Sequence, residues 1–221
     1  MKKKRPISRR NFLKGTAKTA GAIGFPFIVP ASVFGADAPS NRIVMGAIGV
    51  GGMGSGDLNG FLGQSDVHVV AVCDVDGKHR DKAKSRVDRK YNNKDCKTYS
   101  DFRKMIARGD LDAVQLALPD QWHAIPAIAA AKAGLDIHAQ KPLARSIREG
   151  RAMCNAVKRY GAVWQTGSQQ RSNSRFRFAC ELVRNGRIGK VLKTEVGLPT
   201  GRGGGSTAPK PVPDGLDWNF W

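Results

Sequence analysis

The glycine-rich stretch GVGGMG at residues 49–54 is the first part of the sequence that could do chemistry. It follows an apolar run at 42–48 and precedes a helical pattern. Glycine at these spacings permits a tight turn at Gly49, close approach of a phosphate at Gly51, and close helix–strand packing at Gly54. Backbone amides and the helix dipole would stabilise the phosphate charge. The stretch therefore predicts a pyrophosphate-binding turn made of Gly49, Val50, Gly51, Gly52, Met53 and Gly54.

Asp74 ends the next apolar run, at 67–75, twenty residues after Gly54. A carboxylate there can accept hydrogen bonds from both ribose hydroxyls of the adenosine half of a dinucleotide. A 2′-phosphate would meet a negative charge, so NAD is favoured over NADP, although Lys78 and Arg80 could partly neutralise such a phosphate. The alternative is a glycine-rich turn that binds nothing.

A second group of chemically capable residues lies between Leu118 and Arg145. The sequence there includes LPDQWHA at 118–124 and HAQKPLA at 138–144. An ammonium group at Lys141 could stabilise a developing alkoxide, or relay its proton once desolvated. Alternatively, a lysine before a proline is a solvated side chain on extended backbone.

Histidines and cysteines give weaker signals. His123 could flank a cofactor pocket or hydrogen-bond backbone groups at a helix start, whereas His68 and His138 should be structural and His79 should lie on the surface. Cys73, Cys96, Cys154 and Cys180 are too widely spaced for a zinc site, so we predict no metal. Buried thiols are expected at Cys73, Cys154 and Cys180.

Strands that alternate with helices must position these groups, which predicts an α/β fold of the Rossmann type, a doubly wound parallel sheet with helices on both faces. We expect this domain at 40–166, and the start of a truncated α+β second domain at 167–221. The expected strands are 42–48, 67–75, 112–118, 135–139, 162–166 and 191–198. Helices are expected after the glycine turn, at about 77–91 with Ala83, Val87 and Tyr91 facing inward, at 125–133, at 146–160 from a capping box, and around 176–183.

Charge and composition exclude several classes of protein. The 221 residues are 41% hydrophobic and 25% charged, which excludes a wholly disordered or collagen-like chain. The net charge of +19 first suggests nucleic acid. However, residues 1–40 hold eight basic residues against one acidic, and 77–108 hold twelve against four. Without a recognition-helix pattern or stacking platform, we expect no nucleic-acid partner.

The first 38 residues resemble a twin-arginine export signal. The run SRRNFLK at 8–14 carries the likeness, and a mildly apolar stretch broken by glycine and proline follows it. We therefore expect the twin-arginine translocase as a partner, a periplasmic or otherwise exported location, and no stable membrane anchor. The alternative is a disordered basic tail that binds something acidic.

Residues 42–221 resemble the glucose–fructose oxidoreductase and inositol dehydrogenase family, usually written Gfo/Idh/MocA. The likeness rests on the glycine fingerprint, the PDxxH and KP elements, and QTGSQQR at 165–171 and GLDWNFW at 215–221. It implies that Lys141 is catalytic and lies near the nicotinamide, and that Pro119, Trp122, His123, Gln140, Lys141 and Pro142 contact the cofactor.

The chain departs from the family pattern at two places. Gln140 replaces the glutamate that most relatives have before Lys-Pro. Residues 167–221 contain no histidine, whereas family members carry a catalytic one deep in the second domain. We therefore expect this chain to be an inactive N-terminal piece of a longer protein.

The resemblance implies an NAD(P)-dependent oxidoreductase that acts on the secondary hydroxyl of a sugar, polyol or glycoside, and an intact protein that is a homo-oligomer. Two alternatives remain open: an NAD-dependent glycoside hydrolase that works by transient oxidation, and a non-catalytic nucleotide-binding protein.

Overall fold

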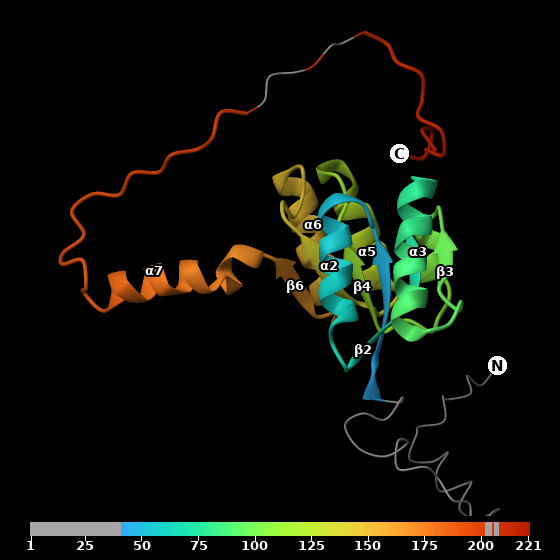
Figure 1. Cartoon of the computed structure of the whole chain (residues 1–221), viewed down its shortest axis with the longest axis horizontal. Helices are drawn as coiled ribbons and strands as arrows, with labels where there is room; N and C mark the ends of the chain where they lie inside the picture. Colours follow the sequence, from blue (N-terminus) through green and yellow to red (C-terminus); the bar gives the residue numbers. More distant parts are fainter. Residues whose placement is uncertain (1–40, 202–204, 206–207) are drawn as a thin grey trace, which may run out of the picture. The chain divides into compact units, whose positions relative to one another are not determined.

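The computed structural model describes residues 41–201, 205 and 208–221, so the expected export signal at 1–38 lies outside the described residues. Six parallel strands form one sheet in the order β3-β2-β1-β4-β5-β6 (Figure 1). This order confirms the predicted Rossmann fold, since β2 and β3 lie on one side of β1 and β4, β5 and β6 lie on the other. The strands are β1 Ile43–Ile48, β2 Val67–Cys73, β3 Lys97–Tyr99, β4 Ala113–Leu116, β5 Asp136–Gln140 and β6 Trp164–Gly167.

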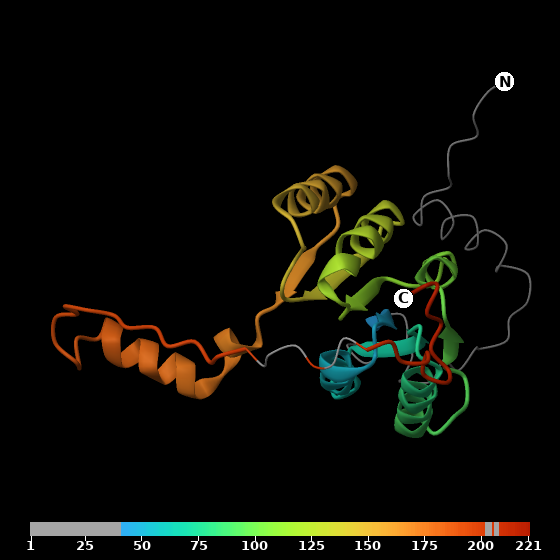
Figure 2. The same ribbon diagram turned by 90° about the horizontal axis from the view of Figure 1, so that it is seen from above.

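Helices cover both faces of this sheet, as the crossovers between parallel strands require (Figure 2). One face carries α2 Gly52–Leu62 and α3 Gly77–Tyr91, and the other carries α5 Ala124–Lys132 and α6 Ile147–Tyr160. The remaining helices are α4 Phe102–Ile106, α7 Ser174–Arg184 and the short 3₁₀ turns η4 Asp120–Trp122 and η5 Gln169–Ser172.

Each face of the sheet has its own hydrophobic core. Under α2 and α3, Leu58, Val69 and Val87 are fully buried, and the predicted inner residue Ala83 is buried with them. The opposite core contains Met105 and Leu116 together with apolar residues of α5 and α6. The apolar strands β1 and β4 are therefore buried from both sides, which explains why their sequence runs are continuous rather than alternating.

Local signals define several helix ends. Ser146 and Glu149 form the predicted capping box of α6, in which the Ser146 hydroxyl accepts from the Glu149 N–H and the Glu149 carboxylate accepts from the Ser146 N–H. After α5 the chain passes through Gly134, whose φ of +79° explains the glycine there.

Three predictions are wrong. Residues 191–198 form no strand, because none of the described residues pairs with their backbone. Cys154 is exposed because Met153 and Ala156 are the residues of α6 that face the core. Cys180 is exposed because α7 has no buried residue. Within the described ranges, no helix is long and apolar enough to cross a membrane.

Candidate functional site

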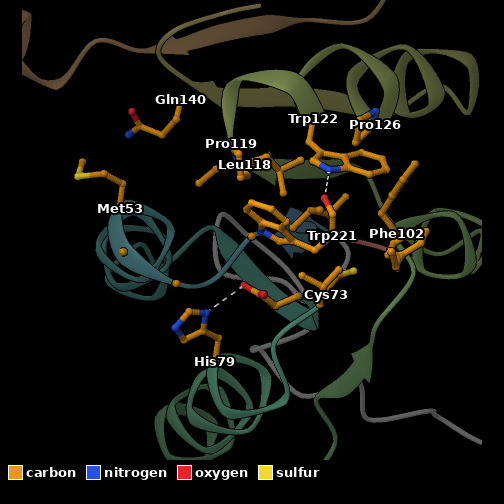
Figure 3. Close-up of a pocket in the computed structure, with 18 of the residues that line it drawn as sticks. Met53, Cys73, His79, Phe102, Leu118, Pro119, Trp122, Pro126, Gln140 and Trp221 are labelled. Carbon is orange, nitrogen blue, oxygen red and sulfur yellow. Dashed lines mark hydrogen bonds and ion pairs between the residues drawn. The ribbon is translucent and has the colours of Figure 1, made fainter. Parts of the chain in front are cut away.

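A pocket of about 360 Å³ opens at the carboxyl ends of the strands, around the point between β1 and β4 where the strand order changes direction (Figure 3). This crevice is where open α/β sheets bind ligands. Nine of the predicted site residues line it, namely Gly49, Gly51, Gly52, Met53, Asp74, Pro119, Trp122, Gln140 and Lys141. The pocket lining does not include Val50, Gly54, His123 or Pro142.

The glycine turn divides into positions that the fold requires and positions that face open space. Gly49 has a φ of +78°, and a Cβ there would lie 2.2 Å from the Ala117 carbonyl oxygen. A Cβ on Gly54 would lie 1.9 Å from the Gly49 oxygen, whereas one on Gly52 would meet nothing within 4 Å. Gly49 and Gly54 therefore serve the turn and the packing of α2, and Gly52 leaves room for a ligand.

The N-terminus of α2 is suited to an anion. Gly51 is the N-cap residue, and no side chain caps the helix or places a negative charge in its first turn. A Cβ on Gly51 would lie 2.8 Å from the imidazole of His79, with no other residue among its nearest contacts. The site therefore fits a phosphate group, which would accept hydrogen bonds from uncapped amides.

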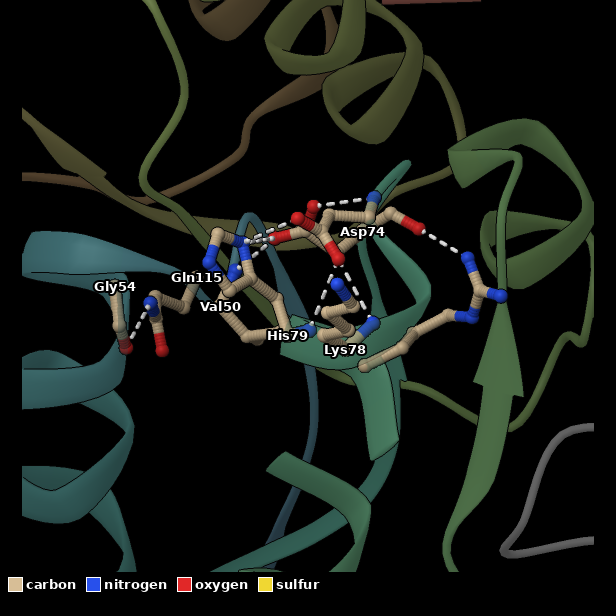
Figure 4. Close-up of polar contacts among 8 residues, drawn as sticks. Val50, Gly54, Asp74, Lys78, His79 and Gln115 are labelled. Atoms are coloured by element: carbon tan, nitrogen blue, oxygen red, sulfur yellow. Dashed lines mark hydrogen bonds and ion pairs between the residues drawn. The ribbon is translucent and has the colours of Figure 1, made fainter. Parts of the chain in front are cut away.

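The Asp74 carboxylate anchors this turn to the end of β2. One oxygen accepts from the Val50 N–H at 2.9 Å and the other from the Asp76 N–H at 3.0 Å (Figure 4). A carboxylate has about four lone-pair directions, so two bonds leave capacity for ligand hydroxyls. The geometry thus fits a ribose beside the glycine turn.

His79 is exposed, as the sequence predicts, and it also lines the pocket, which the sequence did not indicate. Its side chain is half-exposed, but Nδ1 lies 3.7 Å from an Asp74 oxygen and the ring lies against Gly51. The available signal was its position in the first turn of α3, directly after the strand that ends at Asp74. Arg80, from the same turn, donates to the Asp74 carbonyl oxygen at 2.7 Å.

The buried Gln115 is a second residue that the sequence interpretation missed. It lies in β4 and its amide donates to the Gly54 carbonyl oxygen at 3.1 Å, which holds the start of α2 against the sheet (Figure 4). A polar residue in an otherwise apolar strand was the signal.

Gln140 and Lys141 follow each other at the end of β5, and both line the pocket. Gln140 is buried, and its side-chain oxygen accepts from the Lys141 N–H at 3.3 Å. The Lys141 side chain is exposed, and among the described residues its Nζ has no hydrogen-bond or ion-pair partner. Pro142 follows through a cis peptide bond. The amine is thus placed at the pocket without a competing protein acceptor.

His123 is 1% exposed and is the N-cap residue of α5, and its Nε2 lies 2.6 Å from the Leu118 carbonyl oxygen. This contact fits the sequence-based interpretation in which His123 hydrogen-bonds backbone groups at a helix start. Nδ1 is buried without a hydrogen-bond partner among the described residues. A cofactor contact by His123 stays a prediction.

The pKa values of His68 and Cys73 are shifted mainly by burial, which indicates a structural role for both side chains. Burial is the main cause that lowers the pKa of His68, whose ring packs against Tyr91. Burial also raises the pKa of Cys73 to about 12, so the thiol that lines the pocket is protonated and a poor nucleophile. In the part of the chain that the structure describes, no group of three or more His, Cys, Asp or Glu residues could hold a metal ion.

The sequence model of the family described as GFO_IDH_MocA, "Oxidoreductase family, NAD-binding Rossmann fold", matches residues 43–168. Levoglucosan dehydrogenase from Pseudarthrobacter phenanthrenivorans is 39% identical over 93 residues, which cover 42% of this chain and 24% of that protein. A glycosyl hydrolase family 109 protein from Shewanella baltica is 30% identical over 162 residues, which cover 65% of this chain and 35% of that protein.

Among solved structures, myo-inositol 2-dehydrogenase from Lactobacillus plantarum is similar to this chain with a TM-score of 0.62 and 27% identity. The match covers 68% of this chain and 43% of that one. The chain thus spans about a quarter to a third of the length of the two curated relatives, and less than half of this solved structure.

Proposed function

Because the chain belongs to the Gfo/Idh/MocA oxidoreductase family, whose NAD-binding Rossmann fold covers residues 43–168, we propose that the whole protein is an NAD-dependent oxidoreductase. It acts on the secondary hydroxyl of a sugar, polyol or glycoside. The observation that carries this proposal is that the glycine turn, Asp74 and Lys141 all line one pocket.

These residues have separate tasks in the proposed reaction. Residues 49–54 hold the pyrophosphate and Asp74 holds the adenosine ribose, which favours NAD over NADP because a 2′-phosphate would meet the carboxylate. Pro119, Trp122 and Gln140 flank the same pocket. Bound NAD would supply the acceptor for the hydride that leaves the carbinol carbon.

Lys141 acts on the substrate oxygen. Its unpaired ammonium group donates a hydrogen bond to the hydroxyl and stabilises the negative charge that develops as the proton leaves. Gln140 supports this role by accepting from the Lys141 N–H and so positioning the backbone. The family pattern assigns the main proton acceptor to a histidine of the second domain, and residues 167–221 contain no histidine.

Export by the twin-arginine translocase is part of the same proposal. The run SRRNFLK at 8–14 and the basic residues before it support export to the periplasm or beyond. A folded protein that leaves the cytoplasm with its dinucleotide in place would suit this route. A second domain and homo-oligomeric assembly of the intact protein are likewise proposals.

The test uses protein purified from its own cells, so that any residues after Trp221 in the native reading frame are present. NAD⁺ is added with a panel of sugars and polyols, and absorbance at 340 nm is followed. We expect NADH formation, and we expect Lys141→Ala to lower kcat at least 100-fold with a much smaller effect on the Kd for NAD⁺. Lys158→Ala, an exposed lysine of α6, is the matched control. Unchanged turnover in Lys141→Ala would favour a non-catalytic nucleotide-binding protein.

A second candidate function is glycoside hydrolysis by transient oxidation. It is favoured by the match to the glycosyl hydrolase family 109 protein, which covers 65% of this chain, against 42% for levoglucosan dehydrogenase. Release of nitrophenol from nitrophenyl glycosides without net NADH would support hydrolysis, and net NADH from free sugars would support the dehydrogenase.

A further inference from the structure

The segment 214–221, which we call the C-terminal strap, is attached to the backbone that follows Asp74. Two hydrogen bonds and an antiparallel bridge join it to residues 75–77, in the connection between β2 and α3. The hydrogen bonds run from Gly77 N to Gly215 O at 2.9 Å and from Asp217 N to Val75 O at 3.1 Å. The strap is therefore held beside the carboxylate that we assign to the ribose.

The other end of the strap is attached across the pocket, at the connection between β4 and α5. The indole Nε1 of Trp122 donates to the Trp221 carbonyl oxygen at 2.5 Å (Figure 3). The Phe220 ring lies 5.7 Å from the Trp122 ring and 6.4 Å from the Phe102 ring, between centroids. The strap thus bridges two strand ends on either side of β1, and Phe220 and Trp221 both line the pocket.

The pocket lining differs between its two sides. Phe102, Trp122, Phe220 and Trp221 present aromatic rings near Asp74, whereas Gln140 and Lys141 supply polar groups at the end of β5. Aromatic side chains stack on nucleobases of any type, because every nucleobase has a π-face. A base joined to a ribose at Asp74 would meet this aromatic side, and the reacting end of the ligand would meet Lys141.

We propose that Phe220 and Trp221 form a wall of the adenine site, so that the C-terminal strap retains the bound dinucleotide. This inference rests on the proposed function, because it requires NAD in this pocket. Trp221 is 46% exposed, and its ring stacks on the Trp218 ring with the centroids 5.3 Å apart, so a base would pack against the ring face that Trp218 leaves open. Release of the dinucleotide then requires the strap to detach from Trp122, which slows dissociation.

Calorimetric titration of the full chain with NAD⁺ and with ADP-ribose tests this role without measuring activity. We expect Trp221→Ala to raise the Kd of both ligands about tenfold, the usual effect of losing a base–aromatic stack. The two losses of affinity should be equal, because both ligands carry the same adenosine half and differ only at the nicotinamide, which lies away from Trp221. Trp221→Phe, which keeps a ring, should stay within about threefold of the unchanged chain. Phe176→Ala, at an exposed phenylalanine of α7, is the matched control and should bind normally.

The outcomes separate the two proposals. Equal binding by the unchanged chain and Trp221→Ala would overturn the wall and leave the proposed function standing, and tighter binding by Trp221→Ala would show that the ring blocks the site. If the unchanged chain bound neither ligand, both proposals would fail. Thermal unfolding checks the fold of each variant, and Trp221→Leu, which keeps apolar area without a ring face, replaces Trp221→Ala if that variant does not fold.

Discussion

The Gln140 side-chain amide donates to both carboxylate oxygens of Asp57, at 3.1 and 2.9 Å. Gln140 ends β5 and Asp57 lies in α2, so the pair joins the Lys141 loop to the helix that follows the glycine turn. Glutamate at this position would place two carboxylates against each other. A neutral amide at 140 is therefore matched to the aspartate at 57.

Gln140→Glu should lower the free energy of unfolding by about 1–3 kcal/mol at pH 7, because a charged hydrogen bond is replaced by like-charge repulsion. The loss should shrink in acid, because a proton on either carboxylate removes the like-charge repulsion. Urea unfolding at several pH values measures both effects. Gln165→Glu, at an exposed glutamine of β6, controls for the added charge. A Gln140→Glu variant as stable as the unchanged chain would contradict the matching of the pair.

Two glycine substitutions should distinguish the glycine that packs against the turn, Gly54, from the glycine that faces open space, Gly52. Gly54→Ala should cost about 1–3 kcal/mol or more, since its Cβ would lie 1.9 Å from the Gly49 oxygen. Gly52→Ala should leave stability unchanged or slightly raised, because nothing lies within 4 Å and alanine favours helix. Thermal unfolding of the two variants measures the difference, and equal midpoints would contradict the assigned roles.

Thiol reactivity should divide the four cysteines into two pairs. Burial raises the pKa of Cys73 to about 12 and that of Cys96 to about 11, so both stay protonated and covered at pH 8. Cys154 and Cys180 are exposed. Titration with a chromogenic disulfide reagent at pH 8 should therefore detect two fast thiols in the native chain and four in urea. Rapid labelling of Cys73 or Cys96, identified by peptide mass, would show that their burial is wrong.

Asp88 should contribute stability that acid removes. Its carboxylate accepts from Lys84 Nζ at 2.7 Å and from the Cys96 N–H at 3.2 Å, and the Lys84 hydrogen bond is the main cause that holds the pKa of Asp88 below its ordinary value of 3.8. A lowered folded-state pKa gives stability that is present above pH 3.8 and lost as the pH falls through the lowered value. Asp88→Asn should lower the free energy of unfolding by about 1 kcal/mol at pH 7. The difference from the unchanged chain should shrink in acid, because the unchanged chain loses the Asp88 contribution there. Urea unfolding at pH 7 and pH 3 measures this, with Asp81→Asn, at an exposed residue of α3, as control.

Most of the fold was predictable because its signals are local. The apolar runs of β1 and β2, the glycine turn between them and Asp74 occupy one short stretch of sequence, and the capping box of α6 needs only Ser146 and Glu149. The short β3 went undetected because its three residues carry no periodic pattern. Residues 191–198 show that an apolar run becomes a strand only where another backbone is available to pair.

The unpredicted parts of the site depend on contacts between distant residues. Trp122 meets Trp221 across 99 positions of sequence, and Gln140 meets Asp57 across 83. Neither spacing carries a periodic signal, so only the folded chain reveals these pairs. His79 is closer to its partners, but the pattern of α3 reads as a solvated basic helix and hides one side chain turned toward Gly51.

The central position of β1 has a consequence for folding during synthesis. β1 ends at Ile48 and pairs on one side with β2, but its other neighbour, β4, begins only at Ala113, about 65 residues later. At about 5–20 residues per second, a ribosome needs several seconds to make that stretch. During this interval, β1, β2, α2 and α3 can bury much of their shared core, while the opposite edge of β1 waits unpaired. A chaperone that binds extended apolar backbone would find its target at this edge.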